Sequence, residues 1–142
     1  MAPISDISLW QLLKHLSQWL GNLSRAKQQR QRESIEALRA VVLAARHTQA
    51  YLRQLEDTGN QDHATEAKLA GLWTELGFRL IDLGLTKLAK RCDIRGRYWA
   101  NPNNLDADFL QRADIGLERM EQLARQLLAE VEAAPKRGGK SA

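Results

Sequence analysis

Apolar residues recur at alternating steps of three and four along the last third of the chain, and this spacing constrains the fold more than any other feature of the sequence. Such a repeat places the apolar side chains on one face of an α-helix and does not fit the alternation of a strand. It predicts a long final helix with a narrow packing seam, closed by Pro135. The seam consists of Leu110, Ala113, Leu117, Met120, Ala124, Leu127 and Val131.

Four earlier segments, at about 5–20, 33–55, 62–83 and 86–99, carry the same kind of periodicity. The polar stretch 24–34 has almost no apolar residue and is either a linker or, as we expect, the solvated start of the second helix. Turn residues separate them: Gly84 is placed as a left-handed helix stop, and Asn101 precedes a proline and cannot continue a helix. We expect Thr86 to cap the fourth helix, and Gly71 and Gly77 to leave room for a close neighbour of the third. The sequence predicts an all-α fold, either a four- to five-helix antiparallel bundle or stacked helical hairpins. We expect one domain over 1–134 and a disordered basic tail at 135–142.

Composition is that of an ordinary globular protein, with 44% hydrophobic and 27% charged residues among 142. The single cysteine, Cys92, cannot form an intramolecular disulfide, which is typical of a reducing compartment. The N-terminal segment has no basic region ahead of an apolar stretch, and polar residues interrupt its leucines. We therefore expect a cytoplasmic protein with neither a signal peptide nor a membrane span.

The residues that usually carry chemistry are scattered. His15, His47 and His63 are isolated from one another and from the cysteine, so their spacing indicates no zinc site. No glycine-rich phosphate loop is present, and no serine or cysteine has an evident base partner. We expect no catalytic residue, metal or cofactor, and hence no enzyme.

The fourth helix is the most basic segment of the chain, and Tyr98 and Trp99 follow its cations. Cations there could neutralise phosphates while the aromatic rings stacked on bases. The alternative is that the aromatic residues pack inward and the cations form an ordinary solvated face. The candidate polyanion or acidic-partner surface consists of Lys87, Lys90, Arg91, Arg95 and Arg97.

Residues 70–102 resemble a single tetratricopeptide helical hairpin. The matching positions are Trp73, Leu76, Gly77, Gly84, Ala89 and Gly96. Leu80 stands where the family usually has an aromatic residue, and Thr86, Asp93 and the position of Pro102 also depart from the family pattern. The resemblance implies two helices in close approach at Ala89, and a scaffold that binds other proteins. One such repeat cannot bury its own face, so it must pack on the helices around it.

The function that the sequence favours is a non-enzymatic helical protein–protein interaction module, an adaptor or accessory subunit that can self-associate as a homo-oligomer. Arg39, Arg46 and Arg53, which repeat every seven residues, could select an acidic partner. The alternative function is nucleic-acid binding by the basic helix 86–99. The candidate interface on the first and last helices consists of Trp10, Leu13, Trp19, Leu117 and Met120.

Overall fold

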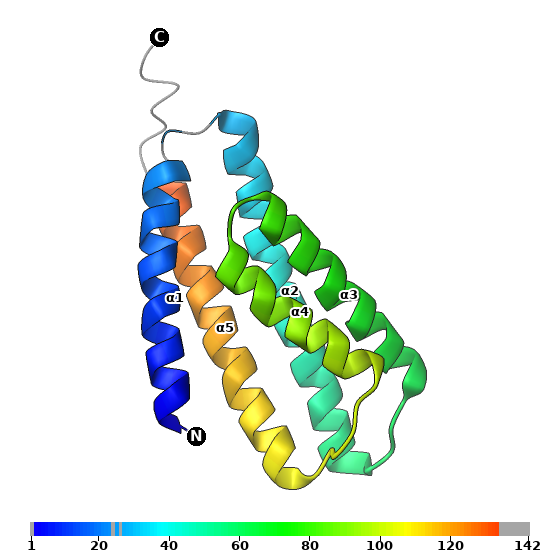
Figure 1. Cartoon of the computed structure of the whole chain (residues 1–142). Helices are drawn as coiled ribbons and strands as arrows, with labels where there is room; N and C mark the ends of the chain where they lie inside the picture. The colour runs from blue at the N-terminus through cyan, green and yellow to red at the C-terminus, as the bar shows by residue number, and fades with distance from the viewer. Residues whose placement is uncertain (1, 24, 26, 134–142) are drawn as a thin grey trace.

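The described part of the chain is all-helical. The computed structural model describes the backbone of residues 2–23, 25 and 27–133, and the side chains of residues 11, 14–23, 25 and 27–133. These residues form α1 (Ala2–Leu23), α2 (Gln28–Thr58), α3 (His63–Asp82), α4 (Thr86–Ala100) and α5 (Ala107–Ala133) (Figure 1). The prediction of an all-α bundle of helical hairpins is confirmed, whereas the expected tail at 135–142 lies outside the described residues.

Several helix ends form for the reasons that the sequence suggests. The Asp62 side chain accepts a hydrogen bond from the backbone N–H of Ala64 at the start of α3. Asp106 accepts one from the N–H of Phe109 at 2.8 Å and so caps α5. Gly84, after α3, has φ +86°, a left-handed conformation that glycine adopts without strain.

Two of the expected helix ends are wrong. Thr86 is the first residue of α4 and not its cap; the cap position is Leu85, which makes no side-chain capping bond. The first helix, α1, was expected to end at about residue 20, but it runs through Gly21 and Asn22 and ends at Leu23. A glycine within a helix weakens it without ending it, so periodicity alone cannot place the stop.

The α3–α4 hairpin is the most closely packed pair of helices. A Cβ atom at Gly77 would lie 3.3 Å from the carbonyl oxygen of Ala89, and one at Gly96 would lie 3.1 Å from the backbone nitrogen of Thr74. Backbone therefore meets backbone on both sides of the hairpin, and larger residues at these glycines would force the helices apart. The close approach at Gly77 and Ala89 is the one that the sequence predicts.

The two longest helices, α2 and α5, form the second extensive contact. Five residues of the predicted seam of α5 are buried: Leu110, Leu117, Met120, Ala124 and Leu127. Leu123, which the prediction did not include, is buried with them, whereas the predicted Ala113 and Val131 are half-buried. Ion pairs bridge the same two helices at the surface, from Arg39 to Glu132 and from Arg46 to Glu121, each at 2.9 Å. The apolar seam and its polar edges thus run along the same pair of helices.

Side-chain contacts also join α4 to α2, and α1 to the α3–α4 turn. A T-shaped contact between Tyr51 and Trp99, with ring centroids 5.6 Å apart, joins α2 to α4. The indole N–H of Trp19 donates to the carbonyl of Leu83 at 2.9 Å, so α1 is anchored to the α3–α4 turn. Within the described residues, no helix is both long and apolar enough to cross a lipid bilayer.

Candidate functional site

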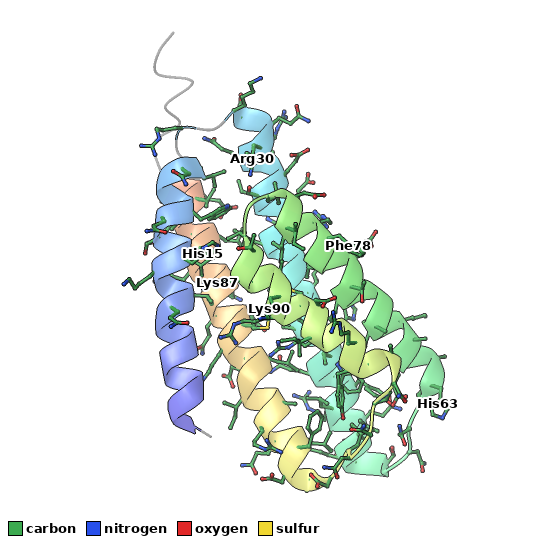
Figure 2. The ribbon with its side chains drawn as sticks, in the orientation of Figure 1. His15, Arg30, His63, Phe78, Lys87 and Lys90 are labelled. Carbon is green, nitrogen blue, oxygen red and sulfur yellow. The ribbon has the colours of Figure 1, made fainter. Side chains whose placement is uncertain are left out.

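The five basic residues of α4 do not form one exposed patch. Lys87 and Lys90 are exposed, and Figure 2 shows both on the ribbon of α4. Arg97 is exposed as well, and it pairs with Asp93 one turn away, at 3.1 Å. Arg91 and Arg95 are half-buried. The fold thus divides the predicted cluster by environment.

Arg95 lies inside the bundle. Its guanidinium carbon is 5.7 Å from the centroid of the Trp73 ring, a cation–π distance, and its Nη1 donates to the carbonyl of Arg91 at 3.1 Å. Burial lowers the pKa of the Arg95 guanidinium from its ordinary value. A half-buried cation with these contacts packs α4 against α3 and is less accessible to an external anion than the exposed lysines.

The aromatic residues at the end of α4 belong to the structure. Trp99 is buried in the core. The Tyr98 ring is half-buried and stacks on Phe109 of α5 with the centroids 4.8 Å apart. Its hydroxyl donates to the carbonyl of Asn103 at 2.7 Å. Both rings take part in packing, as the alternative in which the aromatic residues pack inward predicts.

Three residues of the candidate interface lie in the core of the chain itself. Trp19 of α1 and Leu117 and Met120 of α5 are all buried in the same hydrophobic cluster. In this fold they are not available to a partner. The side chains of Trp10 and Leu13 lie outside those that the structure describes.

The arginines that repeat along α2 have partners within the chain. Arg39 and Arg46 form the ion pairs with α5, and hydrogen bonding to Glu121 raises the pKa of Arg46. Arg53, the third of the series, is exposed. Two of these three arginines therefore already pair with carboxylates of α5 within the same chain.

Titratable groups in the interior are explained by packing. Burial raises the pKa of Cys92 to about 12, so its thiol stays protonated and unreactive at neutral pH. Glu66, also buried, accepts hydrogen bonds from Tyr51, Gln61 and His63. Among the described residues, no three His, Cys, Asp or Glu side chains gather as metal ligands would.

A small polar pocket of about 200 Å³ lies where α1, the start of α2 and the α3–α4 turn meet. Its lining includes His15, Trp19, Arg30 and Gly84, and Figure 2 labels His15 on α1 and Arg30 on α2. The buried Nε2 of His15 has no hydrogen-bond partner among the described residues. The pocket lies at the contact between α1 and the rest of the fold, and it has room for a few water molecules.

The side of α3 that faces away from the bundle carries a second apolar stripe, which we call the α3 outer face. Phe78 is 64% exposed and Ile81 is 54% exposed, one turn apart on this helix (Figure 2 labels Phe78). Among the described side chains, the other exposed large apolar residues lie singly on α2, α4 and α5. The α3 outer face consists of Ala67, Gly71, Thr74, Phe78 and Ile81, again at steps of three and four. Thr74 marks the edge of this face, because it is half-buried and its hydroxyl lies against Gly96 of α4.

Gly71 makes a notch in this face. A Cβ atom there would meet nothing within 4 Å, in contrast to Gly77, whose missing side chain admits α4. The expectation that both glycines accommodate a neighbour therefore holds within the chain only for Gly77. The notch deepens a shallow groove that is lined by Ala67, Lys68, Gly71, Leu72, Thr74, Glu75 and Phe78.

Phe78 is not among the residues predicted to form a site. The stronger apolar stripe of α3, which includes Trp73 and Leu76, forms the buried side of the helix, whereas Ile81 is exposed. The signal that could have found the face is the second set of three-and-four steps from Ala67 to Ile81. An ordinary surface helix needs only one such stripe.

No protein-family model matches the sequence, and comparison with curated proteins and with solved structures finds no match. The resemblance of residues 70–102 to a tetratricopeptide hairpin therefore stays a prediction.

Proposed function

We propose that this chain is a non-enzymatic helical protein-interaction module that receives a partner helix on the α3 outer face. The observation that supports it is the exposed Phe78 beside the open notch at Gly71. A large apolar side chain next to a backbone that nothing covers is the arrangement that a docked helix completes.

Physical costs within the chain favour this function. A glycine in the middle of a helix costs about 0.5–1 kcal/mol relative to alanine, and nothing in the chain approaches Gly71 to make use of it. Leaving Phe78 and Ile81 exposed forgoes the free energy of burying them. Both costs are recovered when another helix covers the face.

The tetratricopeptide resemblance agrees with this proposal, because hairpins of that family usually bind proteins. Nucleic-acid binding, the alternative, has less support. Of the five cations proposed for it, Arg95 lies over Trp73 and Arg97 pairs with Asp93. The stacking ring that the alternative needs is not available at Trp99, which is buried.

Site-specific photocrosslinking in the cells that make the protein tests the proposal. A photoreactive phenylalanine analogue replaces Phe78 in one variant and Leu43, which is 57% exposed on α2, in the control. We expect a discrete crosslinked protein from position 78 and none from position 43, with mass spectrometry identifying it. The absence of a crosslink at position 78, or equal crosslinking at both positions, would contradict the proposal.

Fluorescence anisotropy with labelled single- and double-stranded DNA and RNA addresses the alternative. We expect no binding at physiological salt. Salt-sensitive binding that is lost in the double variant Lys87→Gln and Lys90→Gln would instead favour α4 as a polyanion site.

A further inference from the structure

We propose that the partner on the α3 outer face is α3 of a second copy of this chain, in antiparallel orientation, with the two-fold axis between Thr74 and Glu75. This inference rests on the proposed function and names its partner. Three properties of the described residues support it: shape, charge and the polarity of the helix.

The first property is shape. The N-terminal half of the face carries the small residues Ala67 and Gly71, and the C-terminal half carries the large and exposed Phe78 and Ile81. An antiparallel copy places each Phe78 over the Gly71 notch of the other α3, and each Ile81 over Ala67. A parallel copy would place Phe78 against Phe78 and leave the two notches empty.

A two-fold axis makes this match self-complementary, because the contact of Phe78 with Gly71 occurs once on each side of the axis. The axis follows from the sequence, since Thr74 and Glu75 are the two residues midway between Gly71 and Phe78. At the notch nothing of the chain's own structure stands in the way, because a Cβ atom at Gly71 would meet no atom within 4 Å.

The second property is charge. Lys68 and Asp82 border the two ends of the face, both are exposed, and neither takes part in an ion pair among the described residues. In the antiparallel arrangement, Lys68 of each copy lies beside Asp82 of the other, so two opposite-charge pairs form. A parallel arrangement would bring like charges together at both ends.

The third property is the polarity of α3. Asp82 is the last residue of the helix, where the macrodipole disfavours a carboxylate. A lysine from the second copy compensates for that unfavourable position. Glu75 has the opposite effect, since it lies next to the axis and near Glu75 of the second copy, so the interface contains one repulsive contact.

The contact is confined to one face of one helix, so its area is at the lower end of specific interfaces. We expect a dissociation constant of about micromolar or weaker. Sedimentation equilibrium of the full chain over a range of concentrations measures it directly.

The substitution Phe78→Glu removes the large side chain from the notch. We expect it to raise the dissociation constant by roughly tenfold to a hundredfold while circular dichroism and thermal midpoint stay close to those of the wild type. Leu43→Glu, at a similarly exposed position on α2, is the control and should leave the dissociation constant unchanged. Equal weakening by the two substitutions would overturn the assignment of the face.

Gly71→Leu distinguishes a specific fit from general adhesion of apolar surfaces. The single chain has space for the new side chain, so the fold is retained. We expect dimerisation to weaken because the notch is filled, although the surface has become more apolar. Stronger association of this variant would overturn the proposed fit.

Charge reversal tests the orientation. Lys68→Glu alone and Asp82→Lys alone should each weaken the dimer, and the two together in one chain should restore it, because both pairs re-form with their signs exchanged. A parallel dimer would show no such rescue. Glu75→Gln should strengthen the dimer by removing the repulsion at the axis.

The failure of this inference can be told from the failure of the proposed function. A wild-type chain that stays monomeric up to about 1 mM overturns self-association. If position 78 then crosslinks to a different protein, the interaction module stands with another partner. If position 78 crosslinks to nothing, both are wrong.

Discussion

Glu66 shows how one buried carboxylate can be held ionised by its neighbours. It is only 2% exposed, and its oxygens lie 2.6 Å from the Tyr51 hydroxyl, 3.1 Å from the Gln61 amide and 3.1 Å from the His63 ring. Burial tends to raise the pKa of Glu66, but these three hydrogen bonds outweigh it, and the pKa lies below its ordinary value of 4.5. The group joins α2 to the start of α3.

We predict that Glu66→Gln lowers the free energy of unfolding at pH 7 by about 1–3 kcal/mol, because a charge-assisted acceptor is lost in the interior. A carboxylate whose pKa is depressed by folding stabilises the protein above its unfolded pKa and loses that effect as the pH falls through the folded pKa. The difference between wild type and variant should therefore be full above about pH 5 and shrink on acidification below about pH 4.5.

Urea denaturation of both proteins from pH 7 to pH 3 measures this difference. A gap that stays constant across the range would show that the stabilisation does not depend on the charge of Glu66. The sequence does not predict the contact between Tyr51 and Glu66. Tyr51 and Glu66 are fifteen residues apart and meet only because α2 and α3 fold back on each other.

At the scale of the element, the seam of α5 was predicted accurately because one face of a helix against a core leaves a strong period. Leu117 and Met120 are buried as that period implies. The period does not say whether the helix that covers a seam belongs to the same chain. These two residues were candidates for an interface on that account, and α2 covers them here.

We predict that Leu117→Asp removes at least about 3 kcal/mol of stability, because it places a carboxylate without a partner where a leucine was 2% exposed. For a domain of this size that is a large part of the total free energy of unfolding. Circular dichroism and urea denaturation give the measurement.

Ile115→Asp, on the same helix, is the control. Ile115 is 45% exposed, so we expect a change within about 0.5 kcal/mol. If Leu117→Asp instead yielded a folded chain with altered self-association, the seam would be an interface and not part of the core.

At the scale of the whole molecule, the helices and their order could be predicted, but the pairing of faces could not. The sequence marks Gly71 and Gly77 alike as places for a close neighbour, and only the arrangement of α4 shows that Gly77 has one. The partner of Trp19 could not be predicted either, because its indole N–H donates a hydrogen bond to the carbonyl of Leu83, sixty-four positions away. Apolar periodicity indicates that one face of a helix is covered, but it does not indicate which helix covers it.

The division of α4 into separate environments is also a property of the whole molecule. Sequence spacing places Arg95 and Lys90 in one basic cluster, whereas packing puts the first over Trp73 and leaves the second in solvent. Charge counted along a helix therefore overstates the charge that a partner can reach.

The buried thiol of Cys92 can be used to measure how often the helical core opens. Because only the thiolate reacts with alkylating reagents, a cysteine that is enclosed in the core and protonated at neutral pH is labelled only when the packing around α4 opens. The alkylation rate under native conditions thus records how often the molecule visits its open states. Cysteines introduced at the surface could carry dyes without changing the alkylation rate measured at Cys92.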